Sequence, residues 1–317
     1  MTRFLAAFGG IMIAAMIGRS ASGQMLDVGT LPHDSPAYGI TLALTEVVGA
    51  NSPLSLRPVA FDRSSAALFN LDRGKVTMAV ANAITANLAI RDSGGHKGQK
   101  LAKLRILARL LTFRAGFVVR NESDIRRISD FKGRSFPTGF TAHSVLGTLA
   151  RAAFATEGMS WKDVNGKSFK SFAHSMKELV AGRIEGSFFA PESRLVREAN
   201  ALVRLRFLSI NQNPATTAVI RRIAPGAFFS VIKPRRQLSF LNKATTVLGV
   251  DYLILIGSGV QPEVAYETAK TLYLRRKDLI ARHPLFRSFE SKLMGKKGIG
   301  PAYHSGAIKF YREAGLW

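Results

Sequence analysis

Residues 71–82 read L-D-R-G-K-V-T-M-A-V-A-N, and residues 179–190 repeat this outline as L-V-A-G-R-I-E-G-S-F-F-A. In each stretch a helical pattern ends at a glycine, Gly74 or Gly182, and a basic residue and a continuous apolar run follow. Glycine suits the left-handed position after a helix, and an apolar run without alternation suits a strand buried on both faces of a parallel sheet. Two such steps, far apart in the chain, predict two α/β lobes. The alternative is a chance match, because helix-glycine-strand steps are common in α/β proteins.

Helical and strand patterns alternate on both sides of these two steps. Strands are expected at 26–29, 54–61, 76–81, 134–137, 167–172, 184–189 and 203–208, and helices at 36–48, 64–71, 84–90, 143–157, 175–181, 192–200, 262–282 and 305–313. Such alternation favours parallel sheets covered by helices. Because open α/β sheets bind ligands beyond the carboxyl ends of their strands, Asn82 and Ala190 are expected to face a shared crevice.

Two apolar segments are candidates for crossing from one lobe to the other. Residues 104–120 contain two β-like halves separated by Thr112, Phe113 and Arg114, and residues 246–256 form the second candidate. We therefore predict a first lobe at 24–114, to which 285–317 return, and a second lobe at 115–284. The crossings are placed near 112–118 and 246–258. Rotation about such crossings would allow the lobes to close on a small ligand.

The first residues have the order of a secretory signal peptide. Arg3 precedes an apolar stretch from Phe4 to Ile17, and a small-residue segment from Ser20 to Gly23 follows. The apolar stretch is shorter than the ~20 residues that a membrane-spanning helix needs. We predict that the signal peptide, residues 1–23, is cleaved near Gly23 and that the mature protein is exported. A retained membrane anchor is the alternative.

The absence of cysteine excludes disulfides, thiolate metal sites and catalysis by a thiol. The six histidines include no pair at the i, i+4 spacing of a helical metal site, so no metal is expected. The sequence also lacks G-x-S-x-G, Walker and dinucleotide-binding motifs. Neither a cofactor nor an enzymatic activity is therefore predicted.

The formal net charge of +24 raises the question of a nucleic-acid partner. Short basic clusters occur at 221–222, 233–236, 275–277 and 296–297, and the other basic residues are spread through the chain. None of these clusters alternates with aromatic residues as a stacking platform would, so nucleic acid is not the expected partner. A solvated basic surface is the favoured interpretation, and anionic membrane headgroups are a second partner to consider.

Several stretches together resemble one family, the periplasmic TAXI-type solute receptors of tripartite ATP-independent periplasmic (TRAP) transporters. The run G-T-x-x-x-x-S-P-A-Y-G at 29–39 is similar to the family's opening turn and helix, and 71–82 to its helix-G-x-x-D-hydrophobic segment. The segment at the start of the family's second lobe is similar to D-F-K-G-R at 130–134. The end of the helix that follows is similar to A-T-E-G-M at 155–159. The ending H-S-G-A-I-K-F-Y-R-E-A-G-L-W at 304–317 is the most specific match.

The resemblance implies a two-lobed periplasmic-binding-protein-like (type II) α/β fold with hinge-crossing strands. It also implies a periplasmic receptor that captures a small organic anion and delivers it to a TRAP-type membrane permease. The chain departs from the family at 31–34 and at 141–144, where the family usually has glycine-rich turns. Both departures lie at the expected ligand pocket, so they bear on the identity of the solute more than on the class of protein.

Nine residues at expected strand ends and helix starts are the candidate ligand-binding set: Ser35, Tyr38, Arg63, Asn82, Thr138, Thr141, His143, Ser144 and Phe189. Asn82 is the first choice, because an amide at the end of a buried strand offers donors and acceptors to a carboxylate, an amino acid or a keto acid. Each residue also has a structural interpretation. Ser35 and Asn82 suit helix capping, Arg63 suits the exposed surface, and Phe189 suits the core.

Two other classes of protein remain as alternatives. An exported cationic scaffold or surface-binding protein would use the positive charge directly. A hydrolase or isomerase would use His143 with Asp34 across the space between the lobes, and is the less favoured of the two.

Overall fold

The computed structural model describes residues 25–33, 35–91, 100–140, 144–169 and 172–317. Among these residues, eight strands form one sheet in the order β2-β1-β3-β10-β4-β7, with β8 beside β4 and β9 beside β10. The strands are β1 Met25–Thr30, β2 Ser55–Ala60, β3 Met78–Asn82, β4 Leu104–Arg120, β7 Ser187–Phe189, β8 Leu205–Phe207, β9 Ala227–Ile232 and β10 Thr245–Gly257. A separate parallel pair consists of β5 Ser135–Phe140 and β6 Asn165–Phe169. The predicted signal peptide lies outside the described residues.

Ten helices cover the strands in the described ranges. They are α1 Pro36–Asn51, α2 Ser64–Asp72, α3 Ala83–Ile90, α4 Ser144–Ala155, α5 Phe172–Val180, α6 Arg194–Leu202, α7 Pro214–Ile223, α8 Pro262–Leu274, α9 Arg276–Arg282 and α10 Ser305–Glu313. None of them is both long and apolar enough to cross a bilayer, within the part of the chain that the structure describes.

The two sequence steps from helix to strand are confirmed, although the expected parallel pairing of the second strand is wrong, because β7 pairs antiparallel with β4. Gly74 follows α2 with φ +70°, and Gly182 follows α5 with φ +74°, which is the left-handed region that glycine enters without a Cβ penalty. The strand after the first step, β3, is buried at every position. The strand after the second step, β7, is also buried throughout.

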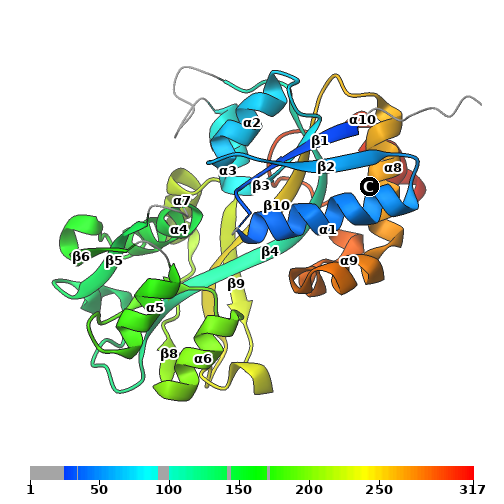
Figure 1. Cartoon of the computed structure of the whole chain (residues 1–317). Coiled ribbons are helices and arrows are strands. Elements are labelled where there is room, and N and C mark those ends of the chain that lie inside the picture. The colour runs from blue at the N-terminus through cyan, green and yellow to red at the C-terminus, as the bar shows by residue number, and fades with distance from the viewer. Residues whose placement is uncertain (1–24, 34, 92–99, 141–143, 170–171) are drawn as a thin grey trace, which may run out of the picture.

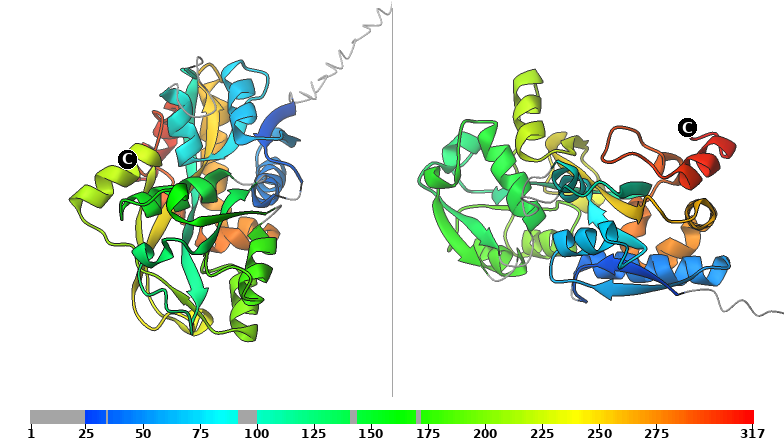
Figure 2. Two further views of the ribbon diagram at one scale, coloured as in Figure 1. Left: turned by 90° about the vertical axis from the view of Figure 1, so that its left-hand side faces the viewer. Right: turned by 90° about the horizontal axis from the view of Figure 1, so that it is seen from above.

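β4 and β10 form the crossing between two lobes. They pair antiparallel along most of their length, from Leu248 opposite Ala115 to Gly257 opposite Leu104. β3 pairs with residues 252–256 of β10, and β9 pairs with residues 245–250. β7 and β8 pair with residues 116–120 of β4. Figure 1 shows β4 as a long diagonal between the lobe of β1 to β3 and the lobe of β5 to β8, and Figure 2 shows the same two bodies from the side and from above.

Two features of the crossing differ from the sequence prediction. β4 is one continuous strand, and the expected break at 112–114 does not occur. The strand continues because the polar side chains at these positions are satisfied. The Thr112 hydroxyl donates to Asp251, and Arg114 forms an ion pair with Glu192. The sheet is also only partly parallel. β1 pairs in parallel with β2 and β3, whereas β10 runs antiparallel to β3, β4 and β9.

Two helical regions also differ from the prediction. The expected helix at 262–282 divides at Arg275 into α8 and α9, because Arg275 leaves the helical conformation with ψ +31°. Helix α7 and strand β9 were not predicted, although Asn213 before Pro214 is a strong helix start.

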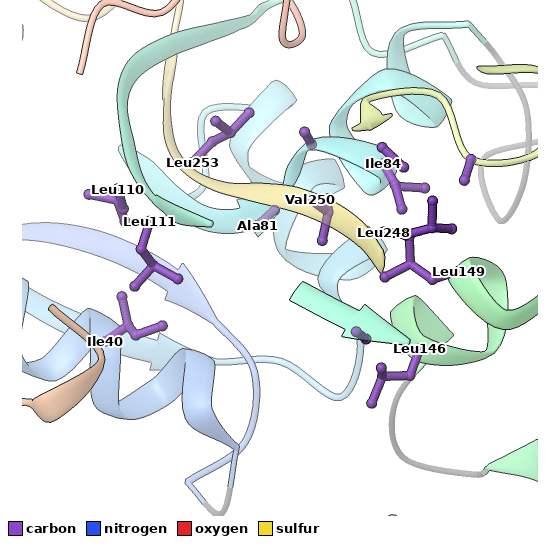
Figure 3. Packing of buried hydrophobic residues seen from close by; sticks show 14 of the residues in the cluster. Ile40, Ala81, Ile84, Leu110, Leu111, Leu146, Leu149, Leu248, Val250 and Leu253 are labelled. Atoms are coloured by element: carbon purple, nitrogen blue, oxygen red, sulfur yellow. The ribbon is translucent and has the colours of Figure 1, made fainter. Parts of the chain in front are cut away.

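The crossing strands pack against one helix from each lobe. Figure 3 shows Leu111 of β4 beside Ile40 of α1, and Leu248 of β10 beside Leu146 and Leu149 of α4. All of these side chains are buried. The core is therefore continuous through the crossing, and α1 and α4 approach it from the two lobes.

Helix α10 begins and ends where the sequence predicts. His304 caps it, because its Nδ1 accepts the Gly306 N–H at 3.2 Å, and Gly315 follows it with φ +67°. The buried Tyr311 hydroxyl donates to the Leu107 carbonyl at 2.6 Å, which ties α10 to β4. The C-terminal segment therefore packs against the first half of β4.

Burial of His304 lowers its pKa in the folded protein. The unfolded chain then binds this proton more readily, so the contribution of His304 to stability is present above the ordinary histidine pKa and is lost as pH falls toward the lower folded pKa. We expect urea denaturation to show a loss of stability between pH 7.5 and pH 5 that is smaller in His304→Asn, which keeps a capping group. An unchanged pH dependence would contradict this assignment.

Candidate functional site

The carboxyl ends of three parallel strands meet at one edge of the first-lobe sheet. β1 pairs in parallel with both β2 and β3, so the segments after all three strands lie at that edge. Ser35 and Tyr38 follow β1, Arg63 follows β2, and Asn82 ends β3. The structure therefore brings the four first-lobe residues of the predicted set to one edge of the sheet.

Ser35 and Tyr38 form the start of α1. The Ser35 side chain accepts the Tyr38 N–H at 3.2 Å, which makes Ser35 the N-cap of the helix. The Tyr38 ring lies 4.1 Å from the His33 ring between centroids, at an interplanar angle of 45°. The capping role of Ser35 leaves the positive end of the α1 dipole at the strand-end edge.

Asn82 also has a capping role. Its Oδ1 accepts the Thr85 N–H at 3.0 Å and lies 3.3 Å from the Thr85 hydroxyl, so it begins α3. The residue is only 5% exposed, and its Nδ2 has no hydrogen-bond partner among the described residues. Capping uses the acceptor of the amide and leaves its donors available.

Tyr252 lies directly opposite Asn82 on β10. Directly opposed residues of antiparallel strands point to the same face, with Cβ atoms about 5 Å apart. Tyr252 is partly exposed, its hydroxyl has no partner among the described residues, and burial raises its pKa to about 12. At neutral pH it is therefore a neutral O–H donor beside the Asn82 amide.

Sequence reasoning missed Tyr252, because it lies within an apolar run that was interpreted only as a crossing. The signal available was a tyrosine next to Asp251 in the middle of that run. Tyr252 also pairs with Leu111, the residue beside Ile40 of α1, so its face of the crossing is the one toward α1.

The second-lobe members of the predicted set are less well defined. Thr138 is partly exposed on β5, and Phe189 is a buried residue of β7 opposite Gly116. Ser144 begins α4, but its side chain is outside the described part of the structure, as are Thr141 and His143. In the first lobe, Arg63 is exposed and makes no side-chain capping bond to α2.

The opposite face of the crossing holds a buried charge cluster. Asp251 is fully buried, and its Oδ1 lies 3.1 Å from Arg109 Nε and 2.5 Å from the Thr112 hydroxyl. Its Oδ2 accepts Lys296 Nζ at 2.7 Å. We name Asp251, Arg109, Thr112 and Lys296 the crossing cluster.

A β-bulge makes the crossing cluster possible. Arg109 and Thr112 are three residues apart, so a regular strand would direct them to opposite faces. The register shifts between Tyr252 and Leu253, which leaves Leu110 without an opposite residue and returns Arg109 to the face of Asp251.

The described residues hold no group of three histidine, cysteine, aspartate or glutamate side chains that could bind a metal ion. His143 and Asp34, the pair of the enzyme alternative, both lie outside these residues.

The fold resembles several solved structures at low sequence identity. A TctC solute-binding protein from Polaromonas has a TM-score of 0.56 and 14% identity, over 92% of this chain and 94% of that chain. MatC from Rhodopseudomonas palustris with bound malate has a TM-score of 0.53 and 10% identity, over 84% and 90%. A Xanthomonas citri protein bound to chloride has a TM-score of 0.52 and 12% identity, over 92% and 97%. The fold is thus the two-lobed periplasmic-binding-protein-like fold.

Sequence comparison gives a family rather than an individual relative. No curated protein matches the sequence. The model of the NMT1-like family matches residues 59–315, which is most of the chain and includes both crossing strands. The protein therefore belongs to the NMT1-like family.

Proposed function

We propose that this protein is an extracytoplasmic solute-binding receptor for a small organic anion and has no catalytic activity. The observation that carries the proposal is the opposed pair Asn82 and Tyr252, whose side-chain donors have no partner among the described residues and lie where the strand ends meet the crossing. Two similar structures are a TctC solute-binding protein and a malate-bound protein, which supports a role in solute capture.

The available donors favour an anionic ligand. The Tyr252 hydroxyl stays protonated at neutral pH, and the Asn82 amide presents two N–H groups. The start of α1 adds the positive end of a helix dipole at the same edge. A carboxylate, amino acid or keto acid would accept hydrogen bonds from all three.

We propose the rest of the ligand-binding set around this pair. Ser35, Tyr38 and Arg63 would approach from the first lobe, and Thr138, Thr141, His143, Ser144 and Phe189 from the second. We also propose two lobes that divide at the crossings near 112–118 and 246–258. The second crossing is supported by the change of partner on β10, from β9 at 245–250 to β3 at 252–256. The expected second lobe at 115–284 extends too far, because α8 and α9 lie beside α1 of the first lobe, where Arg282 pairs with Glu46.

A TRAP-type permease is the proposed partner, and the periplasm the proposed compartment after cleavage of residues 1–23 near Gly23. The support is the resemblance of 29–39 and of 304–317 to TAXI-type receptors. A gene for a large multi-span permease beside the gene for this protein would support the assignment, and a different class of neighbouring transporter would overturn it.

The test of function is a thermal-shift screen with dicarboxylates, amino acids and keto acids, followed by calorimetry and an assay for turnover. A ligand that binds only the folded state raises the melting temperature by mass action. We expect saturable binding of one class of acid without its conversion. Binding of anionic vesicles or DNA at physiological salt, with no response to any acid, would favour the cationic scaffold instead.

Replacing Tyr252 with phenylalanine tests the crossing-strand donor. We expect about 10-fold weaker binding of the acid found in the screen, because one hydrogen bond to a charged group is lost. The melting temperature without ligand should change little, since no residue in the described part of the chain bonds this hydroxyl. Tyr266→Phe is the matched control, because that hydroxyl bonds Glu313 on an exposed surface. Equal affinities in both variants would remove Tyr252 from the site.

Replacing Asn82 with aspartate separates ligand binding from capping. Aspartate keeps the oxygen that caps α3 but exchanges the amide donors for a negative charge. We expect the affinity for an anion to fall about 100-fold or more, while the melting temperature of the free protein falls only slightly. Retained affinity, measured by calorimetry, would place the ligand elsewhere.

A further inference from the structure

A cavity of about 650 Å³ lies between the two lobes on the crossing-cluster side of β10. One wall comes from α7, from the turn after it and from β9. The other comes from α3 and residues 296–299 of the first lobe. Phe228 of β9 pairs with Gly249, two residues from Asp251, which places this wall on the face opposite Tyr252. We name this space the rear cavity.

Asn87 holds the first-lobe wall in place. Its Nδ2 donates to the Ala83 carbonyl at 2.8 Å and to the Ile299 carbonyl at 3.0 Å, so it fixes the 296–299 segment against α3. A Cβ at Gly226 would come within 2.8 Å of the same amide, and φ +96° at Gly226 favours glycine. The α7–β9 turn therefore approaches α3 closely, and the two walls are in direct contact at one end.

The charge of the rear cavity has one sign. Five basic residues are among those that line it, namely Arg91, Arg221, Arg222, Lys296 and Lys297, and no acidic residue is found among its described lining. Arg221 and Arg222 make no ion pair with any described residue. Like charges held around one concave space raise its potential and concentrate small anions there. Arginine also matches the geometry of phosphate and carboxylate with paired N–H donors.

Lys296 connects the rear cavity to the crossing cluster. Its Nζ lies 2.7 Å from Asp251 Oδ2 and 4.2 Å from the centroid of the Phe228 ring. One cavity-lining cation is thus bound to the fully buried carboxylate at the point where β10 changes lobes. An anion in the cavity would contact α7 of one lobe and the lysine segment of the other.

We propose that the rear cavity is a second anion site, separate from Asn82 and Tyr252, which binds a small anion carrying two or more negative charges. An anion of this kind, such as inorganic phosphate or pyrophosphate, can engage Arg221 and Arg222 together, whereas a monovalent ion can neutralise only one of them. Because both lobes supply its walls, an occupied cavity stabilises the lobe arrangement seen in the structure.

The test is titration of the protein with sodium phosphate and pyrophosphate, against sodium chloride at matched ionic strength. Saturable binding of pyrophosphate by calorimetry, with a rise in melting temperature that chloride does not give, is the expected result. The double variant Arg221→Gln/Arg222→Gln should weaken binding about 10-fold or more, because two charged donors are lost. Both residues are exposed on α7, so the variant should keep the fold.

The matched control is Arg287→Gln/Lys292→Gln, which removes the same charge from exposed positions outside the cavity. We expect it to bind pyrophosphate within about 2-fold of the unchanged protein, because distant surface charges are screened. Equal losses of pyrophosphate affinity in the two double variants, or no saturable binding at all, would show that the cavity is only part of a general cationic surface.

Tyr252→Phe should leave pyrophosphate binding unchanged. A loss in that variant would assign the anion to the solute site instead and overturn the second site.

Discussion

Replacing Asp251 with asparagine is expected to lower the free energy of unfolding by about 3–5 kcal/mol, because it leaves a buried arginine without its counter-charge. Asp251 is fully buried, and the Arg109 side chain that it binds is only 5% exposed. Asparagine has nearly the same shape, so the loss measures charge rather than packing. Chemical denaturation at pH 7 is the measurement.

Two further variants make this result specific. Asp27→Asn removes the carboxylate of the ion pair with Arg57, whose side chain is 62% exposed, and should cost less than about 1 kcal/mol. The double variant Asp251→Asn/Arg109→Met should recover part of the loss, because both buried charges are then absent. If Asp251→Asn costs no more than Asp27→Asn, the crossing cluster does not stabilise the junction of the lobes.

Replacing Gly306 with alanine is expected to destabilise the protein by about 3 kcal/mol, the upper end of the usual overpacking range, although alanine normally favours a helix. A Cβ at this position would lie 2.0 Å from the Pro262 carbonyl oxygen and 2.7 Å from its carbon. These are backbone atoms of α8, so neither can move aside without shifting the helix. Thermal and urea denaturation are the measurements.

Gly147 provides the matched control. It lies within α4, and a Cβ there would meet nothing within 4 Å. Gly147→Ala should therefore raise stability by about 0.5–1 kcal/mol, the ordinary gain in helix propensity. A stabilised Gly306→Ala variant would show that α8 and α10 are not in the close contact described. The expected loss of stability would explain Gly306 in the C-terminal motif by helix packing rather than by ligand binding.

Local sequence signals predicted much of the fold correctly. The helix-glycine-strand steps at Gly74 and Gly182, the start of α1 at Ser35 and Pro36, and the bounds of α10 were all confirmed. Each of these depends on residues within a few positions of one another. Helix capping, left-handed glycine and burial of a short apolar run are decided at that range.

The sequence interpretation failed where partners are distant. The polar residues Thr112 and Arg114 predicted a break in β4, but Asp251 and Glu192 satisfy them from 139 and 78 residues away. The basic clusters at 221–222 and 296–297 were interpreted as solvated surface, yet the fold places both around the rear cavity. Spacing along the chain contains no signal for either arrangement.

The sequence by itself determined the α/β class, the two lobes and the strand ends, because periodicity and capping act between neighbouring residues. Only the tertiary structure decided that Tyr252 faces Asn82, that a bulge at Leu110 directs Arg109 toward Asp251, and that two basic clusters share one cavity. These juxtapositions depend on the register of β4 and β10. The pairing of the long strands fixes that register, and no local pattern encodes it.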